Sequence, residues 1–375
     1  MIYLDNAATT QMSEVALQAL NEISSNQFGN PSAAYGLGRK IKEVLEESRR
    51  IIAGCIGAEP EEIFFTSCGT ESDNWVINQL GSVWKKTITS EIEHHAILYP
   101  AKKMRDKGYN VKFLPVNKDC LISTDTLVEA LDGAPALVSV MMQNNETGVI
   151  QDIKEMAKRV HADNGHSVFH TDAVQVVGHL NIDVKDLSID MLSASAHKFN
   201  GPKGVGFLYI RKNCSVSPFI LGGGQERGMR SGTENVAGIY SMAKALEDNV
   251  SCMEDIQARV ASLDKLLVDT LTAEKIDFTI NGGNRRRASG ILNIAIKDID
   301  GEGLLNMLDM HDICISIGSA CNSKSQDRSH VLTAMGIDNE RIDSSVRISI
   351  GRYNTEDDIR TLVKWIVKYS RITAL

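Results

Sequence analysis

The sequence predicts an α/β protein in which strands and helices alternate over most of the chain. Short apolar runs recur between longer stretches whose apolar residues have helical spacing. One of these runs, residues 136–142, is almost entirely apolar, which is typical of a strand buried on both faces of a sheet. Alternation of this kind produces βαβ units, so we expect a mostly parallel sheet.

The expected elements of this sheet follow one another along the chain. Strands are predicted at residues 62–66, 87–89, 111–114, 136–142, 168–170, 191–192 and 205–210. Helices are predicted at residues 35–54, 70–80, 96–107, 124–131 and 153–163. The first of these helices precedes the sheet, and its residues Leu37, Ile41 and Val44 recur at the spacing of an amphipathic helix.

The last third of the chain has a different pattern, in which strands and helices no longer alternate regularly. Helices are expected at residues 234–248, 252–273 and 302–310, and strands at residues 291–296 and 346–350. A chain of 375 residues is also longer than one core usually supports. We therefore expect a large domain at residues 1–250 and a small α+β domain at residues 251–375, with the first ~20 residues packing on the small domain.

Composition excludes several classes of protein. Hydrophobic residues make up 43% and charged residues 23%, which is typical of a soluble globular chain. A formal charge of −8 disfavours a direct nucleic-acid partner, and no apolar run approaches the ~18 residues of a membrane span. The N-terminus lacks the pattern of a signal peptide. The odd number of cysteines, 7, without a C-x-x-C pair, argues against a disulfide scaffold or zinc ribbon and favours a reducing, cytoplasmic location.

Three polar segments lie next to predicted strands, and Asp172 follows one directly, where ligands gather in open α/β sheets. Lys198 precedes a Gly/Pro-rich turn; a desolvated lysine can act as a Schiff-base nucleophile, although a surface lysine is the commoner case. Asp172 is able either to keep a pyridinium nitrogen protonated or simply to cap a helix. Residues 66–72 run from a strand into a helix whose free N–H groups suit a phosphate, or which is capped without any ligand.

Three further side chains are candidates for chemistry. His94 follows a predicted strand. It either stacks on a cofactor ring or is an ordinary loop histidine. A metal site is disfavoured, because no further ligands occur nearby at typical spacing. Cys321 lies among small polar residues, as an exposed, reactive thiol does, whereas Cys314 lies in the apolar run before it. Arg347 interrupts an apolar alternation, where an arginine either clamps a carboxylate or joins an internal ion pair.

Together these segments closely resemble the cysteine desulfurases of the NifS/IscS type, which are pyridoxal 5'-phosphate (PLP) enzymes of fold-type I in the class V aminotransferase family. The resemblance covers nearly the whole chain, from residues 3–10 to residues 351–355. Specific motifs also match at residues 28–32, 143–148 and 227–235. The resemblance implies a large domain with a mostly parallel seven-stranded sheet and a smaller α+β C-terminal domain that carries the catalytic cysteine.

The resemblance assigns a cofactor role to each matching residue. It implies that Lys198 holds PLP covalently, that Asp172 pairs with the pyridine nitrogen, and that His94 stacks on the ring. Gln175 would bond the phenolic oxygen. The residues implied to hold the phosphate are Gly69, Thr70, Ser195, His197 and, from the other subunit of a homodimer, Thr233.

It likewise implies the substrate and the reaction. Asn145 and Arg347 would hold the carboxylate of L-cysteine, and the Lys198 amine would remove its α-proton, with His94 as a proton shuttle. The Cys321 thiolate would then attack the substrate sulfur, which yields L-alanine and a persulfide on Cys321. A sulfur-acceptor protein collects that sulfur; among relatives it serves iron–sulfur clusters, tRNA thiolation or DNA phosphorothioation.

The chain departs from the family pattern at several places. Asp327 and Arg328 stand where relatives often have Glu-Pro, and Lys324 with Arg328 makes this segment more basic. Such charge either lowers the pKa of Cys321, attracts an acidic acceptor, or is merely solvated. Cys68 stands where relatives usually have glycine, with no functional account. The chain ends at Leu375, so the tail with which some relatives dock a scaffold protein is expected to be short or missing.

Two alternatives to a desulfurase remain. The first is a related PLP-dependent lyase acting on cystine, selenocysteine or cysteine sulfinate, for which Cys321 would be dispensable. The second is a non-catalytic binding or scaffold protein with the same fold. Lys198, Asp172 and His94 argue against the second, because binding alone requires none of their chemistry.

Overall fold

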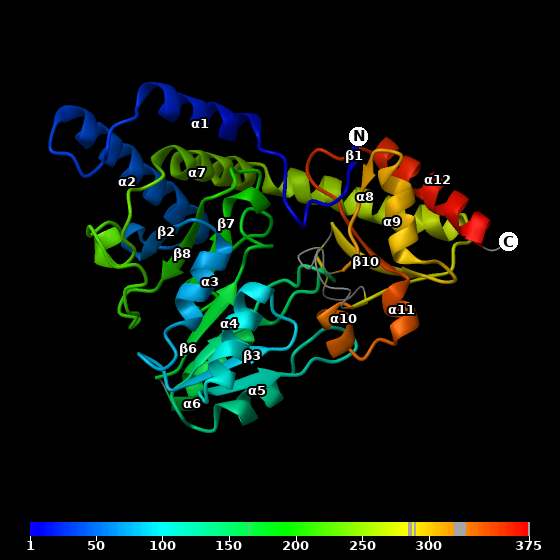
Figure 1. The fold of residues 1–375 in the computed structure, drawn as a ribbon, viewed down its shortest axis with the longest axis horizontal. Helices are drawn as coiled ribbons and strands as arrows, with labels where there is room; N and C mark the ends of the chain where they lie inside the picture. The colour runs from blue at the N-terminus through cyan, green and yellow to red at the C-terminus, as the bar shows by residue number, and fades with distance from the viewer. Residues whose placement is uncertain (165, 284–286, 289, 319–327, 374–375) are drawn as a thin grey trace.

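A single sheet of seven strands forms the centre of the larger part of the molecule (Figure 1). The computed structural model describes residues 1–164, 166–283, 287–288, 290–318 and 328–373. In order across the sheet, the strands are β2 (Ile63–Thr66), β8 (Gly206–Ile210), β7 (Met191–Ser195), β6 (Val168–Asp172), β5 (Leu137–Ser139), β3 (Lys86–Ser90) and β4 (Asn110–Leu114). β8 is antiparallel to both of its neighbours, and every other pair is parallel. The predicted mostly parallel seven-stranded sheet is confirmed.

One strand is shorter than its apolar sequence predicts. The run at residues 136–142 forms a ladder only at β5, yet residues 140–142 stay buried. Their backbone continues to bond to β6, through Val140 N to His170 O and Met142 N to Asp172 O. The apolar run at residues 136–142 therefore predicts burial correctly. The regular strand pairing ends earlier, at Ser139, before the motif at residues 143–148.

Helices cover this sheet and account for most of the first hydrophobic core. They are α1 (Glu14–Asn26), α2 (Gly36–Ile56), α3 (Gly69–Ile77), α4 (His95–Asp106), α5 (Thr124–Leu131), α6 (Ile153–Asn164) and α7 (Val236–Ser251), with short 3-10 turns η1 (Pro60–Glu62), η2 (Ala196–Lys198) and η3 (Glu226–Gly228). α1 and α2 both pack on α7, at the upper left of Figure 1. Ala16 of α1 and Leu246 of α7 belong to the same buried cluster as Phe169 and Leu192 of the sheet.

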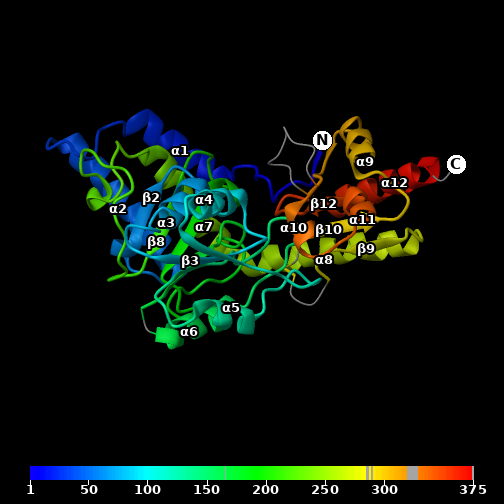
Figure 2. The same ribbon diagram turned by 60° about the horizontal axis from the view of Figure 1, so that its bottom comes forward.

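A second core lies beside the first, at the right of both ribbon views (Figure 2). Its elements are the antiparallel strands β9 (Phe278–Ile280), β10 (Ile291–Ile296) and β12 (Ser345–Ser349), and the helices α8 (Met253–Ala273), α9 (Gly301–Asp309) and α12 (Glu356–Thr373). The short helices α10 (His330–Ala334) and α11 (Asn339–Asp343) instead contribute to a separate small cluster with Ile92 and Met141. The proposed domain division near residue 250 falls between α7 and α8. None of the helices in the described ranges is long and apolar enough to cross a membrane.

The N-terminal segment connects the two cores. β1 (Ile2–Tyr3) pairs in parallel with β11 (Ile313–Cys314), and Leu4 is buried in the second core. The next element, α1, packs on the first core instead. Residues 5–10 therefore cross the junction between the cores, and Ala7 and Ala8 among them line the site described below.

Candidate active site

A cavity of about 300 Å³ opens at the carboxyl ends of β6 and β7, between the two cores. It gathers most of the side chains that the sequence singled out, namely Gly69, Thr70, His94, Asn145, Asp172, Gln175, Ser195, His197, Lys198 and Arg347. Thr233 is exposed and does not line this cavity. Cys321 lies outside the described residues, as do Lys324 and Asp327.

Lys198 is held at both its amine and its backbone. It lies in η2, directly after β7, and its Nζ donates to the carbonyl oxygens of Ala7 (2.5 Å) and Ala8 (2.9 Å). Its own carbonyl oxygen accepts a hydrogen bond from Nε2 of His179 at 2.7 Å. The N-terminal segment thus receives the lysine amine, while His179 fixes the main chain that carries it.

Asp172 ends β6 and provides a buried carboxylate on the cavity wall. Its side chain is 6% exposed, and Oδ1 accepts a hydrogen bond from Val174 N at 2.9 Å. Burial raises the pKa of Asp172 to about 6, opposed by that N–H and by the charge of Lys198. At neutral pH the group is ionised at a cost, so it is poised to pair with a cation.

One end of the cavity is suited to an anion. α3 begins at Gly69, and Cys68 before it makes no side-chain capping bond, so the first N–H groups of the helix are available. A side chain at Gly69 would place its Cβ 2.7 Å from Cγ2 of Val174, so only glycine lets the backbone approach this closely. Within the described part of the chain, the buried Oγ of Ser195 finds no hydrogen-bond partner.

These observations fit PLP. A buried hydroxyl without a partner and a helix N-terminus suit its phosphate, Asp172 suits its ring nitrogen, and the Lys198 amine suits its aldehyde. His197 is beside them, with Nδ1 3.1 Å from Oγ1 of Thr9, and burial first and Lys198 second lower the pKa of its imidazole to about 4. A neutral imidazole is a hydrogen-bond donor to phosphate without adding a charge.

His94 is neutral in this structure. It caps α4, and its Nδ1 accepts a hydrogen bond from Ala96 N at 3.2 Å, which places the ring proton on Nε2. Burial first, and then the charges of Lys198, His95 and His330, lower the pKa of His94 to about 4. The prediction that His94 shuttles protons assumed an ordinary histidine pKa. In the protein without ligand, desolvation lowers the pKa of His94 below that ordinary value.

Arg347 forms the internal ion pair that was one of the two alternatives left open by its sequence context. Its Nη2 forms an ion pair with Oδ1 of Asp5 at 2.7 Å, and its Nη1 donates to the carbonyl oxygen of Asn145 at 3.0 Å. Its Nε is buried and has no partner among the residues that the structure describes. One guanidinium N–H is therefore still free to bind a carboxylate, next to Asn145.

Several residues of the cavity were not singled out from the sequence. Asp73, His95 and His330 line it, as does Glu146, whose Oε2 accepts a hydrogen bond from Oγ of Ser329. Asp73 was detectable, because it follows Gly69 at the spacing that places two residues on one face of a helix. Glu146 lies inside the recognised motif at residues 143–148. No local signal brings His330, at the start of α10, to this place.

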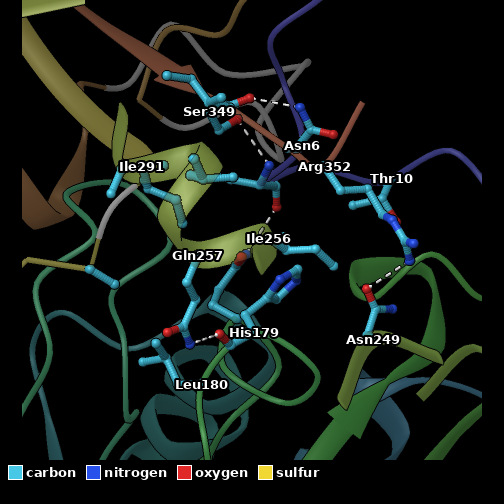
Figure 3. Close-up of a pocket in the computed structure, with 18 of the residues that line it drawn as sticks. Asn6, Thr10, His179, Leu180, Asn249, Ile256, Gln257, Ile291, Ser349 and Arg352 are labelled. Atoms are coloured by element: carbon cyan, nitrogen blue, oxygen red, sulfur yellow. Dashed lines mark hydrogen bonds between the residues drawn. The ribbon is translucent and has the colours of Figure 1, made fainter. Parts of the chain in front are cut away.

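A larger cavity, of about 510 Å³, lies across the N-terminal segment from the first (Figure 3). Ala7 and Gln175 line both cavities, and Nε2 of Gln175 donates to Ala7 O at 2.9 Å. Nε2 of Gln257, from α8, donates to the backbone carbonyl of His179 at 2.6 Å, as Figure 3 shows. The residue that fixes the Lys198 backbone is thus tied to the second core.

Comparisons with known proteins agree with this geometry. A family model described as aminotransferase class-V matches residues 2–362. The chain is 43% identical over 363 residues to a cysteine desulfurase IscS of Methanosarcina thermophila, with 96% of this chain and 89% of that protein covered. It resembles the solved structure of a NifS-like protein with a TM-score of 0.92 and 35% identity over 99% of each chain.

A further solved structure, that of SspA in complex with cysteine, matches with a TM-score of 0.83 and 32% identity over 95% of this chain and 100% of that one. The family match extends over both cores and over every element that lines the smaller cavity. This chain therefore belongs to the class-V aminotransferase family, in the branch of the IscS- and NifS-like cysteine desulfurases.

Proposed function

We propose that this protein is a PLP-dependent cysteine desulfurase, which converts L-cysteine to L-alanine and retains the sulfur as a persulfide on Cys321. The observation that carries the proposal is the single cavity that gathers the Lys198 amine, the buried Asp172 carboxylate, an anion-binding helix start and a free N–H of Arg347. The relative from Methanosarcina thermophila is named a cysteine desulfurase, and the SspA structure is of a complex with cysteine.

Each cofactor-binding residue has a defined task in this proposal. PLP, when bound, withdraws electrons from the α-carbon of an amino acid. Lys198 holds its aldehyde carbon, and the Asp172 carboxylate stabilises a proton on its ring nitrogen. The phosphate is held by the N–H groups of Gly69 and Thr70 and by the side chains of Thr70, Ser195 and His197. Gln175 donates to the phenolic oxygen, and the neutral His94 ring packs on the cofactor.

The chain's own groups then handle the substrate. Arg347 Nε and the Asn145 side chain bind its carboxylate, and the Lys198 amine accepts its α-proton. The Cys321 thiolate forms a bond to the substrate sulfur as the carbon–sulfur bond breaks. The electron pair of that bond stays on the carbon side, which takes up a proton and leaves as L-alanine, while the sulfur remains on Cys321 as a persulfide.

The assembly and the acceptor complete the proposal. Thr233 is exposed in one chain, and in a homodimer it would reach the phosphate of the partner subunit's site. An acceptor protein in the cytoplasm then receives the sulfur, for iron–sulfur clusters, tRNA thiolation or DNA phosphorothioation. Arg328 adds little free charge for recruiting it, because it pairs with both carboxylate oxygens of Asp343 at 2.8 and 2.7 Å.

The test is product formation from L-cysteine by the PLP-loaded protein, beside Lys198→Ala. We expect equal amounts of alanine and sulfide in the presence of a thiol reductant, and neither product from the variant. Release of pyruvate instead of alanine, or turnover of cystine, selenocysteine or cysteine sulfinate but not of cysteine, would favour the related lyase. A loaded protein that turns over none of them would favour a binding protein.

A further inference from the structure

Asp73 is a buried carboxyl in the candidate active site to which the proposed reaction gives no task. It lies on α3, one turn after Gly69, and lines the same cavity as Asp172 and Lys198. Its side chain is only 1% exposed. A carboxyl of this kind requires an explanation, because an ionised group without partners is costly to bury.

Asp73 has little support for a negative charge beyond the Ser193 hydroxyl, which favours its ionised form. Its Oδ1 is buried without a hydrogen-bond partner in the described ranges, and the nearby Nε2 of His170 is 3.8 Å away. That nitrogen is already bonded to Oγ of Ser193 at 2.9 Å, and Nδ1 of His170 is bonded to Oγ of Ser139 at 2.9 Å. Burial lowers the pKa of His170 to about 3, so this imidazole is uncharged.

The two buried acids nearest Asp73 in its electrostatic surroundings, Glu93 and Asp172, are better satisfied. Glu93 accepts hydrogen bonds from Oγ of Ser90 at 2.5 Å and from Met141 N at 3.0 and 3.1 Å. Asp172 accepts one from Val174 N, and Lys198 favours its ionised form. Of the three acids, Asp73 therefore has the weakest support for a negative charge.

The groups that face Asp73 add to this difference. They are Asp172, Glu93, Cys68, Ser193 and His170. Burial raises the pKa of Asp73 well above its usual value, and Asp172, Glu93 and Cys68 raise it further, while the Ser193 hydroxyl opposes them only in part. Two neighbouring buried carboxyls do not both ionise readily, and the Lys198 charge favours the ionised form of Asp172, so the proton resides on Asp73.

We propose that Asp73 is a permanently protonated positioning residue, which leaves Asp172 as the ionised member of a carboxyl pair and thereby directs the positive charge of the cofactor ring to Asp172. This inference rests on the proposed function, because it deepens the account of how the site binds PLP. A neutral Asp73 adds polarity beside Asp172 without adding a second negative charge that would compete for the ring nitrogen or for the Lys198 ammonium.

The proton on Asp73 is directly measurable in the protein without cofactor. We would record infrared spectra at pH 8 in H₂O and D₂O of protein labelled with ¹³C at the aspartate carboxyls, which leaves Glu93 unlabelled. A protonated-carboxyl C=O band that shifts in D₂O, is absent from Asp73→Asn and persists in Asp172→Asn is the expected result. Absence of the band from the wild type, or its survival in Asp73→Asn, overturns the proposal.

Cofactor binding gives a second readout. Asn is the uncharged counterpart of a protonated Asp, so Asp73→Asn should change the Kd of PLP by less than about threefold and leave the pH midpoint of bound-cofactor absorbance in place. Loss of an ionised Asp73 would instead move that midpoint by about one pH unit, a tenfold change in the proton equilibrium, and would refute the proposal. Asp172→Asn is the matched control and should weaken binding.

The two failures are distinguishable. If wild-type protein binds no PLP, the proposed function is wrong, and the infrared spectrum of the cofactor-free protein still decides the protonation of Asp73. If PLP binds normally and Asp73→Asn shifts the absorbance midpoint, the proposed function stands and the inference about Asp73 falls. If Asp73→Asn does not fold, the pH titration of the labelled wild-type band decides, because a midpoint below pH 7 contradicts a permanent proton.

Discussion

Replacing Asp172 with Asn should stabilise the cofactor-free protein at neutral pH while it weakens PLP binding. The Asn side chain retains an oxygen that accepts from Val174 N, so the substitution removes the charge and keeps the hydrogen bond. Burial raises the pKa of Asp172 from 3.8 to about 6, so the folded protein holds its proton more tightly than the unfolded chain. Ionising Asp172 in the fold therefore costs roughly 3 kcal/mol, at ~1.4 kcal/mol per pKa unit.

The sign of the pH dependence follows from proton binding. Between pH 3.8 and about 6 the folded state binds more protons at Asp172 than the unfolded state, so this group lowers the stability as the pH rises. Above about pH 6 the whole penalty is present, and below pH 3.8 it is absent. Asp172→Asn should thus exceed wild type in free energy of unfolding by roughly 3 kcal/mol at pH 7.5, and by about nothing at pH 3.5.

Urea denaturation of cofactor-free protein at these two pH values measures the difference directly. PLP must be removed, because a ligand that binds only the folded state adds its own stabilisation. Asp119→Asn, at an exposed aspartate, is the matched control and should show no such pH-dependent gain. An Asp172→Asn protein that is no more stable than wild type at pH 7.5, or a gain that grows towards acid pH, would refute the reasoning.

Two further predictions concern the same site. Ser195→Ala removes a buried hydroxyl that has no partner among the described residues, so the cofactor-free protein should lose no stability in urea denaturation. The Kd for PLP should rise about tenfold in an absorbance titration, and an unchanged Kd would exclude Ser195 from the phosphate site. His179→Leu removes the donor to the Lys198 carbonyl oxygen and should lower the free energy of unfolding by about 1–3 kcal/mol. His179→Asn should recover part of this stability, and an equal loss in both variants would show that packing, not the hydrogen bond, is the cause.

Local sequence pattern predicts the elements that carry the site, because strand and helix periods need only neighbouring residues. Asp172 was predicted to follow a strand, and it ends β6, at the edge of the sheet where residues after parallel strands meet. The antiparallel orientation of β8 and the early end of β5 depend on how the chain turns in space, and neither is visible in an apolar run.

Contacts between distant segments were beyond local reasoning. The ion pair of Arg347 with Asp5 joins residues separated by 342 positions, and β1 pairs with β11 across a similar separation. The depressed pKa of His94 likewise depends on burial and on Lys198, His95 and His330, which only the folded chain brings together. The family resemblance placed the motif at residues 143–148 in the site, which the hydrophobic period alone did not do. Asn145 of this motif lines the cavity together with the distant Arg347.

The most direct test of the proposed function is a single-turnover experiment with L-cysteine in the absence of a reductant. PLP-loaded wild-type protein should release about one equivalent of alanine per site and then stop, because the persulfide stays on the protein. Cys321→Ser should bind PLP as wild type does and release no alanine. Continued alanine formation without reductant, or an undiminished burst from Cys321→Ser, would contradict sulfur transfer to Cys321.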